Sequence, residues 1–202
     1  MAKDGRLGFH SLDYTQPPYW LSPYRIIKTS LINGYPAKMF DIPPPPTVPP
    51  NTPVAIIAQL EQPSELTREC VASITSHYGV NPVVMSVIHK VEGGYSGARI
   101  KNTDGSYDLG FSQINTIHMP TLKRFGLTEK MVKNNNCVNL GIAAWHVRTV
   151  TKNQKASDKD DFFRAVARYH NKNEPHISVY TGKLIKAYDE LIKEYGSKKL
   201  WP

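Results

Sequence analysis

Residues 82–94 read Pro-Val-Val-Met-Ser-Val-Ile-His-Lys-Val-Glu-Gly-Gly, and this short segment carries the clearest pattern in the chain. Its apolar residues recur at the i, i+3, i+4, i+7 spacing of a helix with one buried face, and they are Val84, Val87, Ile88 and Val91. Asn81 can cap this helix, Pro82 suits its first position, and two glycines after Glu92 should end it. The pattern predicts a buried helix that ends on an acidic residue.

A carboxyl group at the end of an apolar stripe is chemically unusual. The carboxyl end of a helix carries partial negative charge, and apolar surroundings disfavour an ionised carboxyl, so both effects should raise the pKa of Glu92. A raised pKa is what a general acid needs near neutral pH. The alternative is a surface glutamate at a frayed helix end.

Helical patterns also flank this segment on both sides. Upstream, an apolar face that includes Cys70 and Tyr78 follows Ser64, a candidate cap, and stops before Gly79. Downstream, candidate caps at Thr128, Asn136 and Asp160 introduce further helices, and a last helix is expected over 178–195.

Residues 95–110 differ from these helices, because Asn102-Thr103-Asp104-Gly105 is a turn sequence between short segments. We predict a small β-hairpin or irregular lobe there. The fold class is therefore mainly α, with one compact helical domain interrupted by a small β lobe.

Residues 43–50, Pro-Pro-Pro-Pro-Thr-Val-Pro-Pro, mark the clearest boundary in the chain. Such a run cannot continue a helix and favours an extended polyproline conformation. We therefore divide the chain into an N-terminal extension with its proline-rich spacer, residues 1–53, and a folded domain, residues 54–202. The extension is either a docking segment for a partner or a disordered tail.

The net charge of +8 favours a polyanionic partner such as nucleic acid, an anionic membrane face or an acidic cell-wall polymer. The sequence has no arginine-rich block, helix-turn-helix pattern, zinc spacing or aromatic RNA-binding signature, which argues against nucleic acid. No stretch approaches the roughly 20 apolar residues of a membrane span, and the first 25 residues lack the apolar centre of a secretory signal.

Three motifs together resemble the lytic transglycosylases, goose-type lysozyme-like enzymes, and especially the small ones attached to conjugation and type IV secretion systems. Glu92 stands where that family has its catalytic glutamate. Gly110-Phe111-Ser112-Gln113-Ile114 is similar to the family's Gly-Leu-Met-Gln-Ile motif, and Ala167-Arg168-Tyr169-His170-Asn171 to its Ala-Tyr-Asn motif. The resemblance covers residues 64–195 and implies a lysozyme-like helical fold.

The resemblance also implies roles for individual residues. Glu92 would be the catalytic acid and base, and the substrate-binding residues would be Ser112, Gln113, Asn115, Tyr169 and His170. Three positions depart from the family pattern: Gly93 replaces a serine, Ser112 a methionine and His170 an asparagine. These departures leave the contacts that support Glu92 open.

The activity that the resemblance implies is cleavage of peptidoglycan glycan strands to 1,6-anhydro-muramyl products, without a cofactor. Glycoside cleavage commonly uses two carboxylates, and Asp108 is the nearby candidate for the second one, in a lysozyme-like hydrolysis. An aspartate beside a glycine more often caps a turn. His118, His146 and His170 lack a regular metal-ligand spacing, so we expect no metal site.

The two cysteines of the chain, Cys70 and Cys137, lie on separate predicted helices. They are either free buried thiols or one disulfide, and a disulfide suits an enzyme of the periplasm or cell envelope, where the implied substrate lies. Residues 1–53 would then contact secretion or conjugation machinery. A different reading is a non-catalytic structural component that keeps the lysozyme-like fold to bind glycan or partner proteins.

Overall fold

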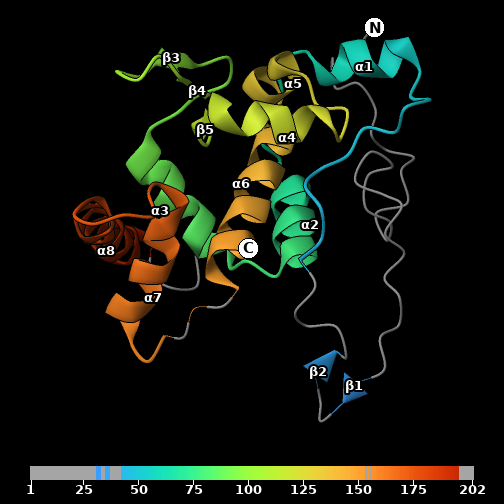
Figure 1. Cartoon of the computed structure of the whole chain (residues 1–202). Helices are drawn as coiled ribbons and strands as arrows, with labels where there is room; N and C mark the ends of the chain where they lie inside the picture. The colour runs from blue at the N-terminus through green and yellow to red at the C-terminus, as the bar shows by residue number, and fades with distance from the viewer. Residues whose placement is uncertain (1–30, 33–34, 37–41, 153, 155, 196–202) are drawn as a thin grey trace, which may run out of the picture.

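The computed structural model of the chain describes residues 31–32, 35–36, 42–152, 154 and 156–195. The fold is mainly helical with a small antiparallel sheet, as the sequence predicts. Helix α6 (Asn136–Thr151) runs through the middle of the domain and packs against α2 (Arg68–Tyr78), while α8 (His176–Tyr195) packs against α3 (Pro82–Glu92) and α7 (Lys159–Val166), as Figure 1 shows.

Shorter elements complete the domain. They are α1 (Val54–Leu60), α4 (Met119–Lys123), α5 (Glu129–Asn134) and the 3-10 turns η1 (Thr116–His118) and η2 (Ala167–Tyr169). Before the domain, β1 (Leu31–Ile32) and β2 (Tyr35–Pro36) pair antiparallel with each other. One apolar cluster fills the space between the helices, and its fully buried members include Ile74, Ile88, Leu122, Met131 and Leu184. This core fixes the ends of α3 and α8, where the candidate site lies.

The predicted hairpin is confirmed. Strands β3 (Arg99–Lys101) and β4 (Tyr107–Leu109) pair antiparallel across the predicted turn, and β5 (Ile114–Asn115) pairs with the other edge of β4. Within the turn, the Asp104 carboxylate accepts hydrogen bonds from the Ser106 backbone N–H, at 2.9 Å, and from the Ser106 hydroxyl, at 2.6 Å. The sheet lies beside the helices, and Leu109 and Ile114 join it to the helical core.

The helix caps were predicted with mixed success. Asn81 and Thr128 cap α3 and α5 as expected, through their side-chain oxygens. The other three predicted caps are wrong by one to three positions, since the capping residues are Thr67, Asn135 and Asp158. Ser64 instead accepts a hydrogen bond from the Asn136 backbone N–H at 3.1 Å. Each true cap is itself a Thr, Asn or Asp, so neighbouring cap-forming residues compete.

A disulfide joins α2 to α6 through Cys70 and Cys137, whose Cα atoms lie 5.9 Å apart. The bridge closes a loop with a sequence separation of 67 residues that contains α3, the β lobe and α5. In the chain-entropy model a loop of this length stabilises the fold by about 4 kcal/mol. The bridge thus links α2 covalently to α6, the helix that runs through the middle of the domain.

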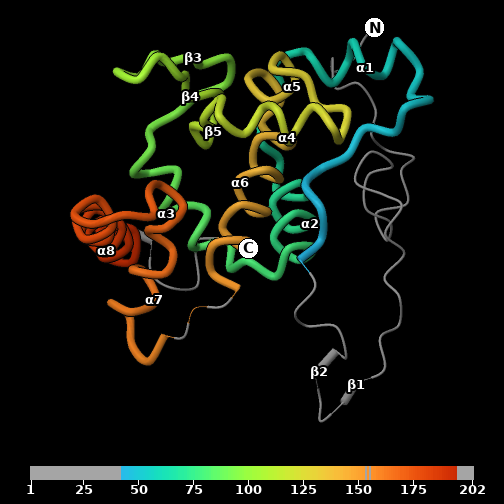
Figure 2. Tube along the Cα trace, in the orientation of Figure 1, coloured from blue at the N-terminus to red at the C-terminus, as the bar shows by residue number. Residues whose placement is uncertain are grey.

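Residues 42–50, which we term the proline strap, pack on the helical domain (Figure 2). Pro45, Pro46 and Val48 are buried. The Tyr78 hydroxyl donates to the Pro44 carbonyl at 2.9 Å, and the Val48 N–H donates to the Phe125 carbonyl at 2.8 Å. The strap therefore contributes to the core of the helical domain. The predicted docking role of residues 1–53 rests largely on positions outside the described residues.

Candidate active site

Glu92 is the last residue of α3, and its side chain is 14% exposed. The buried face of α3 anchors the helix in the core up to the preceding turn, through Val84, Met85, Val87 and Ile88. Gly93 then takes a left-handed conformation with a φ of 63°, which a glycine adopts without strain. The chain thus turns away directly after Glu92 and leaves its carboxyl group at the junction of α3, α8 and the β lobe.

The electrostatic surroundings favour the neutral form of this carboxyl group. Burial raises the pKa of Glu92 to about 7, and the negative charge of Asp108 adds to this effect. The hydroxyl of Tyr180 and the positive charge of Lys183 act in the opposite direction but do not outweigh burial. Glu92 therefore holds its proton up to neutral pH, as the sequence argument predicts for a general acid.

Tyr180 and His170 lie directly against this carboxyl group. Tyr180 is buried in α8, and its hydroxyl donates a hydrogen bond to Oε1 of Glu92. The His170 ring stacks on the Tyr180 ring with centroids 4.5 Å apart and planes inclined by 2°. Its Nδ1 atom lies 3.9 Å from the same Glu92 oxygen. One face of the carboxyl group is thus held by protein groups.

Sequence reasoning missed Tyr180. The residue belongs to the apolar stripe of α8, between Ile177 and Leu184, and this position is typical of a core residue. A buried tyrosine hydroxyl needs a hydrogen-bond partner, and this requirement was the available signal. The partner itself is 88 residues away in the sequence, so local patterns could not identify it.

The loop of the second motif, residues 110–114, is hydrogen-bonded to Tyr169 on one side and to Asn139 on the other. The Tyr169 hydroxyl donates to the Ser112 carbonyl at 2.7 Å, and the Ser112 N–H donates to Oδ1 of Asn139 at 2.6 Å. Asn139 is fully buried in α6, and its Nδ2 donates to the Leu109 and Val132 carbonyls, both at 2.9 Å. Asn139 was not identified from the sequence, although two of its three hydrogen bonds hold this loop and the end of β4, and the third holds α5.

Gln113 has a left-handed backbone with a φ of 53°, which is uncommon for any residue except glycine. Its Nε2 donates to the Gly110 carbonyl at 2.7 Å and closes the loop on itself. Gly94 lies against this turn so closely that a Cβ atom there would lie 2.4 Å from the Gly110 carbonyl oxygen. The second glycine after Glu92 therefore lets the motif loop approach the end of α3.

The remaining predicted site residues occupy two kinds of position. Asn115 supports the sheet, since its Nδ2 donates to Oδ1 of Asp108 at 2.9 Å and to Oγ of Ser106 at 3.0 Å. Ser112 is only 2% exposed, and its backbone N–H and carbonyl are both hydrogen-bonded within the protein. Their substrate-binding roles, like those of Gln113, Tyr169 and His170, remain predictions.

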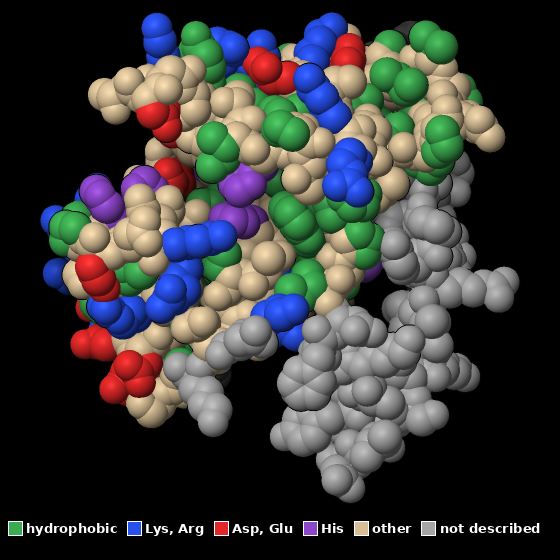
Figure 3. Space-filling model, in the orientation of Figure 1, with side chains coloured by type: hydrophobic (Ala, Val, Ile, Leu, Met, Phe, Trp, Pro, Cys, Tyr) green, Lys and Arg blue, Asp and Glu red, His purple; other side chains and the backbone are tan. Residues whose placement is uncertain are grey.

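Histidines gather on the same face of the molecule, between the β lobe and the α7–α8 pair (Figure 3). The rings of His118 and His146 lie 4.7 Å apart, and His146 Nε2 lies 3.2 Å from the Tyr169 carbonyl oxygen. Burial, with the charges of His118 and Lys172, lowers the pKa of His146 to about 4. Among the described residues, no three His, Cys, Asp or Glu side chains are arranged to hold a metal ion.

The described helices contain none that is both long and apolar enough to cross a membrane. This finding concerns the described part of the chain alone.

Comparison with known proteins gives a partial match. No family model matches the chain. A segment of 48 residues is 44% identical to the Invasion protein IagB of Salmonella typhimurium strains SL1344 and LT2 and of Salmonella typhi. The match covers 24% of this chain and spans 30% of the relatives' length. Over this segment the chain is similar to a bacterial invasion protein.

Proposed function

We propose that this protein cleaves the β-1,4 bond between MurNAc and GlcNAc in peptidoglycan, with Glu92 as the acid and then the base. The observation that carries the proposal is the largely buried carboxyl group of Glu92, which has a pKa of about 7 and accepts a hydrogen bond from the Tyr180 hydroxyl. A carboxyl group that is protonated near neutral pH can give its proton to a glycosidic oxygen.

The reaction we propose is the transglycosylation that the motifs imply. Glu92 donates its proton to the glycosidic oxygen while the bond from that oxygen to C1 of MurNAc breaks. The 6-hydroxyl oxygen of the same sugar then bonds to C1, and its proton passes to the Glu92 carboxylate. The products are a 1,6-anhydro-muramyl end and a free GlcNAc hydroxyl, no water is consumed, and Glu92 is again protonated.

Product analysis of purified peptidoglycan by mass spectrometry tests this proposal. We expect soluble anhydro-muropeptides from the wild type and none from Glu92→Gln, because the amide cannot donate the proton. Glu190→Gln is a matched control, since Glu190 lies on the surface of α8 in an ion pair with Lys90 at 3.3 Å. It should retain the wild-type rate. Full activity of Glu92→Gln would contradict the proposal.

The same experiment separates two alternative functions. Reducing ends would indicate a hydrolytic lysozyme, in which Asp108, whose charge acts on Glu92, serves as the second carboxylate. Peptidoglycan binding without soluble products from any variant would indicate a structural component.

For location and partners, we propose the periplasm or cell envelope and a secretion or conjugation apparatus bound through residues 1–53. The Cys70–Cys137 disulfide supports an oxidising compartment. The similarity over 48 residues to a Salmonella protein named an invasion protein is in keeping with this proposal.

A further inference from the structure

The proposed reaction gives His170, an imidazole beside Glu92, no part in proton transfer or in the position of the carboxyl group. His170 Nδ1 is 3.9 Å from Oε1 of Glu92, which also accepts the Tyr180 hydrogen bond. The His170 side chain is 51% exposed, whereas that of Glu92 is 14% exposed. The imidazole thus stands between the buried carboxyl group and solvent, on the face of the site that Tyr180 also lines.

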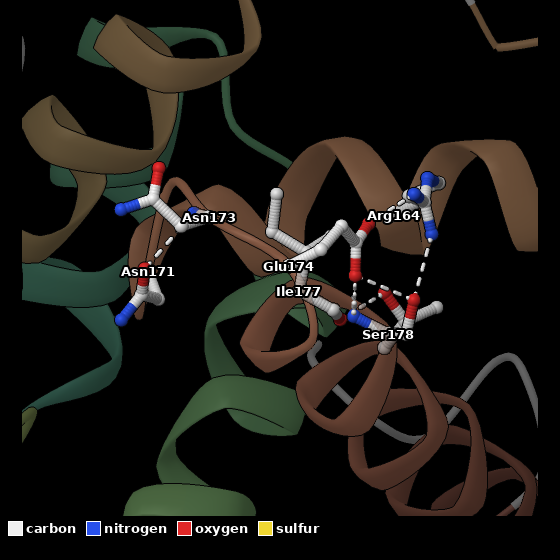
Figure 4. A network of polar contacts seen from close by, with 7 residues as sticks. Arg164, Asn171, Asn173, Glu174, Ile177 and Ser178 are labelled. Carbon is white, nitrogen blue, oxygen red and sulfur yellow. Dashed lines mark hydrogen bonds and ion pairs between the residues drawn. The ribbon is translucent and has the colours of Figure 1, made fainter.

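The position of the His170 ring is fixed from both sides. His170 directly follows η2, and Tyr180, on which it stacks, belongs to α8. The turn between them is held by a polar network (Figure 4), in which Glu174 pairs with Arg164 and accepts the Ser178 hydroxyl at 2.7 Å. Arg164 also donates to the Ser178 hydroxyl at 3.2 Å. These contacts hold the segment between His170 and Tyr180, and therefore help to keep the two rings stacked.

The charged and titratable groups of the elements around the Glu92–His170 pair are Glu92 of α3, Asp108 of β4, Tyr169 of η2, and His176, Tyr180 and Lys183 of α8. Burial and the charge of Lys183 lower the pKa of His170, and Asp108 opposes them. The pKa of Glu92 is about 7, so the proton resides on the carboxyl group while the imidazole is neutral. At a pH lower than this, the His170 imidazole takes up a second proton while Glu92 is already protonated.

We propose that His170 is a positioning residue for Glu92 that works only as the neutral imidazole, and that its protonation sets the acid limit of glycan cleavage. The inference rests on the proposed function. The neutral ring stacks on Tyr180 and keeps its hydroxyl on Glu92. The protonated ring places a full positive charge next to the site where C1 of the sugar itself becomes positive, which opposes the transition state.

Rates of cleavage between pH 4.5 and 9 test the inference in three full-length variants. We expect a bell-shaped profile for the wild type. His170→Phe keeps a flat ring for the stack but cannot titrate, so it should lose the acid limb and retain the alkaline limb. His170→Lys keeps a positive charge at every pH in this range and should be slower on the order of tenfold throughout. His77→Phe, the control on α2, lies outside this set of groups and should keep both limbs.

A second measurement does not depend on activity. The carboxyl carbon of Glu92, followed by 13C NMR, should titrate near pH 7 and show a smaller second step at lower pH, where His170 protonates. The second step should vanish in His170→Phe. Its absence in the wild type, or its persistence in His170→Phe, would overturn the pairing. If the wild type cleaves nothing, the proposed function fails, while this titration still decides whether His170 and Glu92 interact.

Discussion

Burial of the Glu92 carboxyl group keeps it protonated for proton transfer, but it also makes the folded protein less stable at a pH where this group must ionise. Its pKa is about 7 in the folded protein and about 4.5 in the unfolded chain, so its favourable contribution is complete below about pH 4.5. That contribution is lost as the pH rises through 7, because the buried carboxyl group must then ionise. A shift of this size corresponds to about 3 kcal/mol.

We therefore expect Glu92→Gln to become more stable than the wild type as the pH rises. Urea unfolding at pH 5, 7 and 9 should show a difference in unfolding free energy that grows by about 3 kcal/mol in favour of the variant. Glutamine keeps an oxygen that can accept the Tyr180 hydroxyl, so the fold loses no partner. Glu190→Gln should show no such trend, and a constant difference for Glu92→Gln would contradict the assigned burial cost.

Among single residues, the sequence identified those whose signals lie within one helix. The apolar stripe and the glycines after it identified Glu92, because both signals lie within one helix. Tyr180 and Asn139 contact the site from α8 and α6, and their sequence positions look like ordinary core positions. Their roles depend on hydrogen bonds between distant segments, which only the folded chain reveals.

Among the elements, the junction of α3 with the motif loop is the most tightly packed part of the site. A Cβ atom at Gly94 would lie 2.4 Å from the Gly110 carbonyl oxygen and 2.6 Å from that of Phe111. Backbone atoms cannot give way cheaply, so we expect Gly94→Ala to lose about 1–3 kcal/mol of stability. Cleavage should also slow, because the loop that carries Ser112 and Gln113 must move.

Gly182→Ala provides the matched control for this prediction. Gly182 lies within α8, and a Cβ atom there meets nothing within 4 Å. Alanine favours helix more than glycine does, so this variant should gain up to about 1 kcal/mol. Thermal unfolding and cleavage rates of both variants test the pair. Equal stability of the two would show that the close approach at Gly94 is relaxed in solution.

Elements with strong terminal signals were predictable, and weakly marked ones were not. The limits of α3 follow from Asn81 and Gly93, which provide a cap and a stop. Helix α1 was missed because Pro53 precedes it without a side-chain cap and Leu60 is its one buried residue. Helix α7 ends at Val166 without a glycine or proline to mark its end, so the 3-10 turn η2 that follows has no comparable signal in the sequence.

For the molecule as a whole, we expect the proline strap to contribute to the stability of the helical domain, although it precedes that domain in the chain. Val48 is 6% exposed and Val54 is 81% exposed. Val48→Ala removes buried apolar surface and should cost about 2 kcal/mol of unfolding free energy. Val54→Ala should stay within about 0.5 kcal/mol of the wild type. Equal unfolding midpoints for the two variants would mean that the strap is detached in solution.

The sequence predicted the mainly helical fold of the whole molecule but not the packing of the strap. A run of prolines restricts local backbone angles and carries no information about its neighbours. The strap packs against Tyr78, Phe125 and Gly141, which come from α2, the segment after α4, and α6. Only the assembled helices create the surface that buries Val48.

The order of these contacts along the chain has a consequence for biosynthesis. The strap is synthesised before Tyr78, Phe125 and Gly141, so a nascent chain has no complete surface for it until residue 141 has emerged. Contacts between such distant segments form only after a long loop has closed, which slows their formation. Docking of the strap is therefore a late event, and residues 42–50 stay undocked on a newly made chain until α6 has been synthesised.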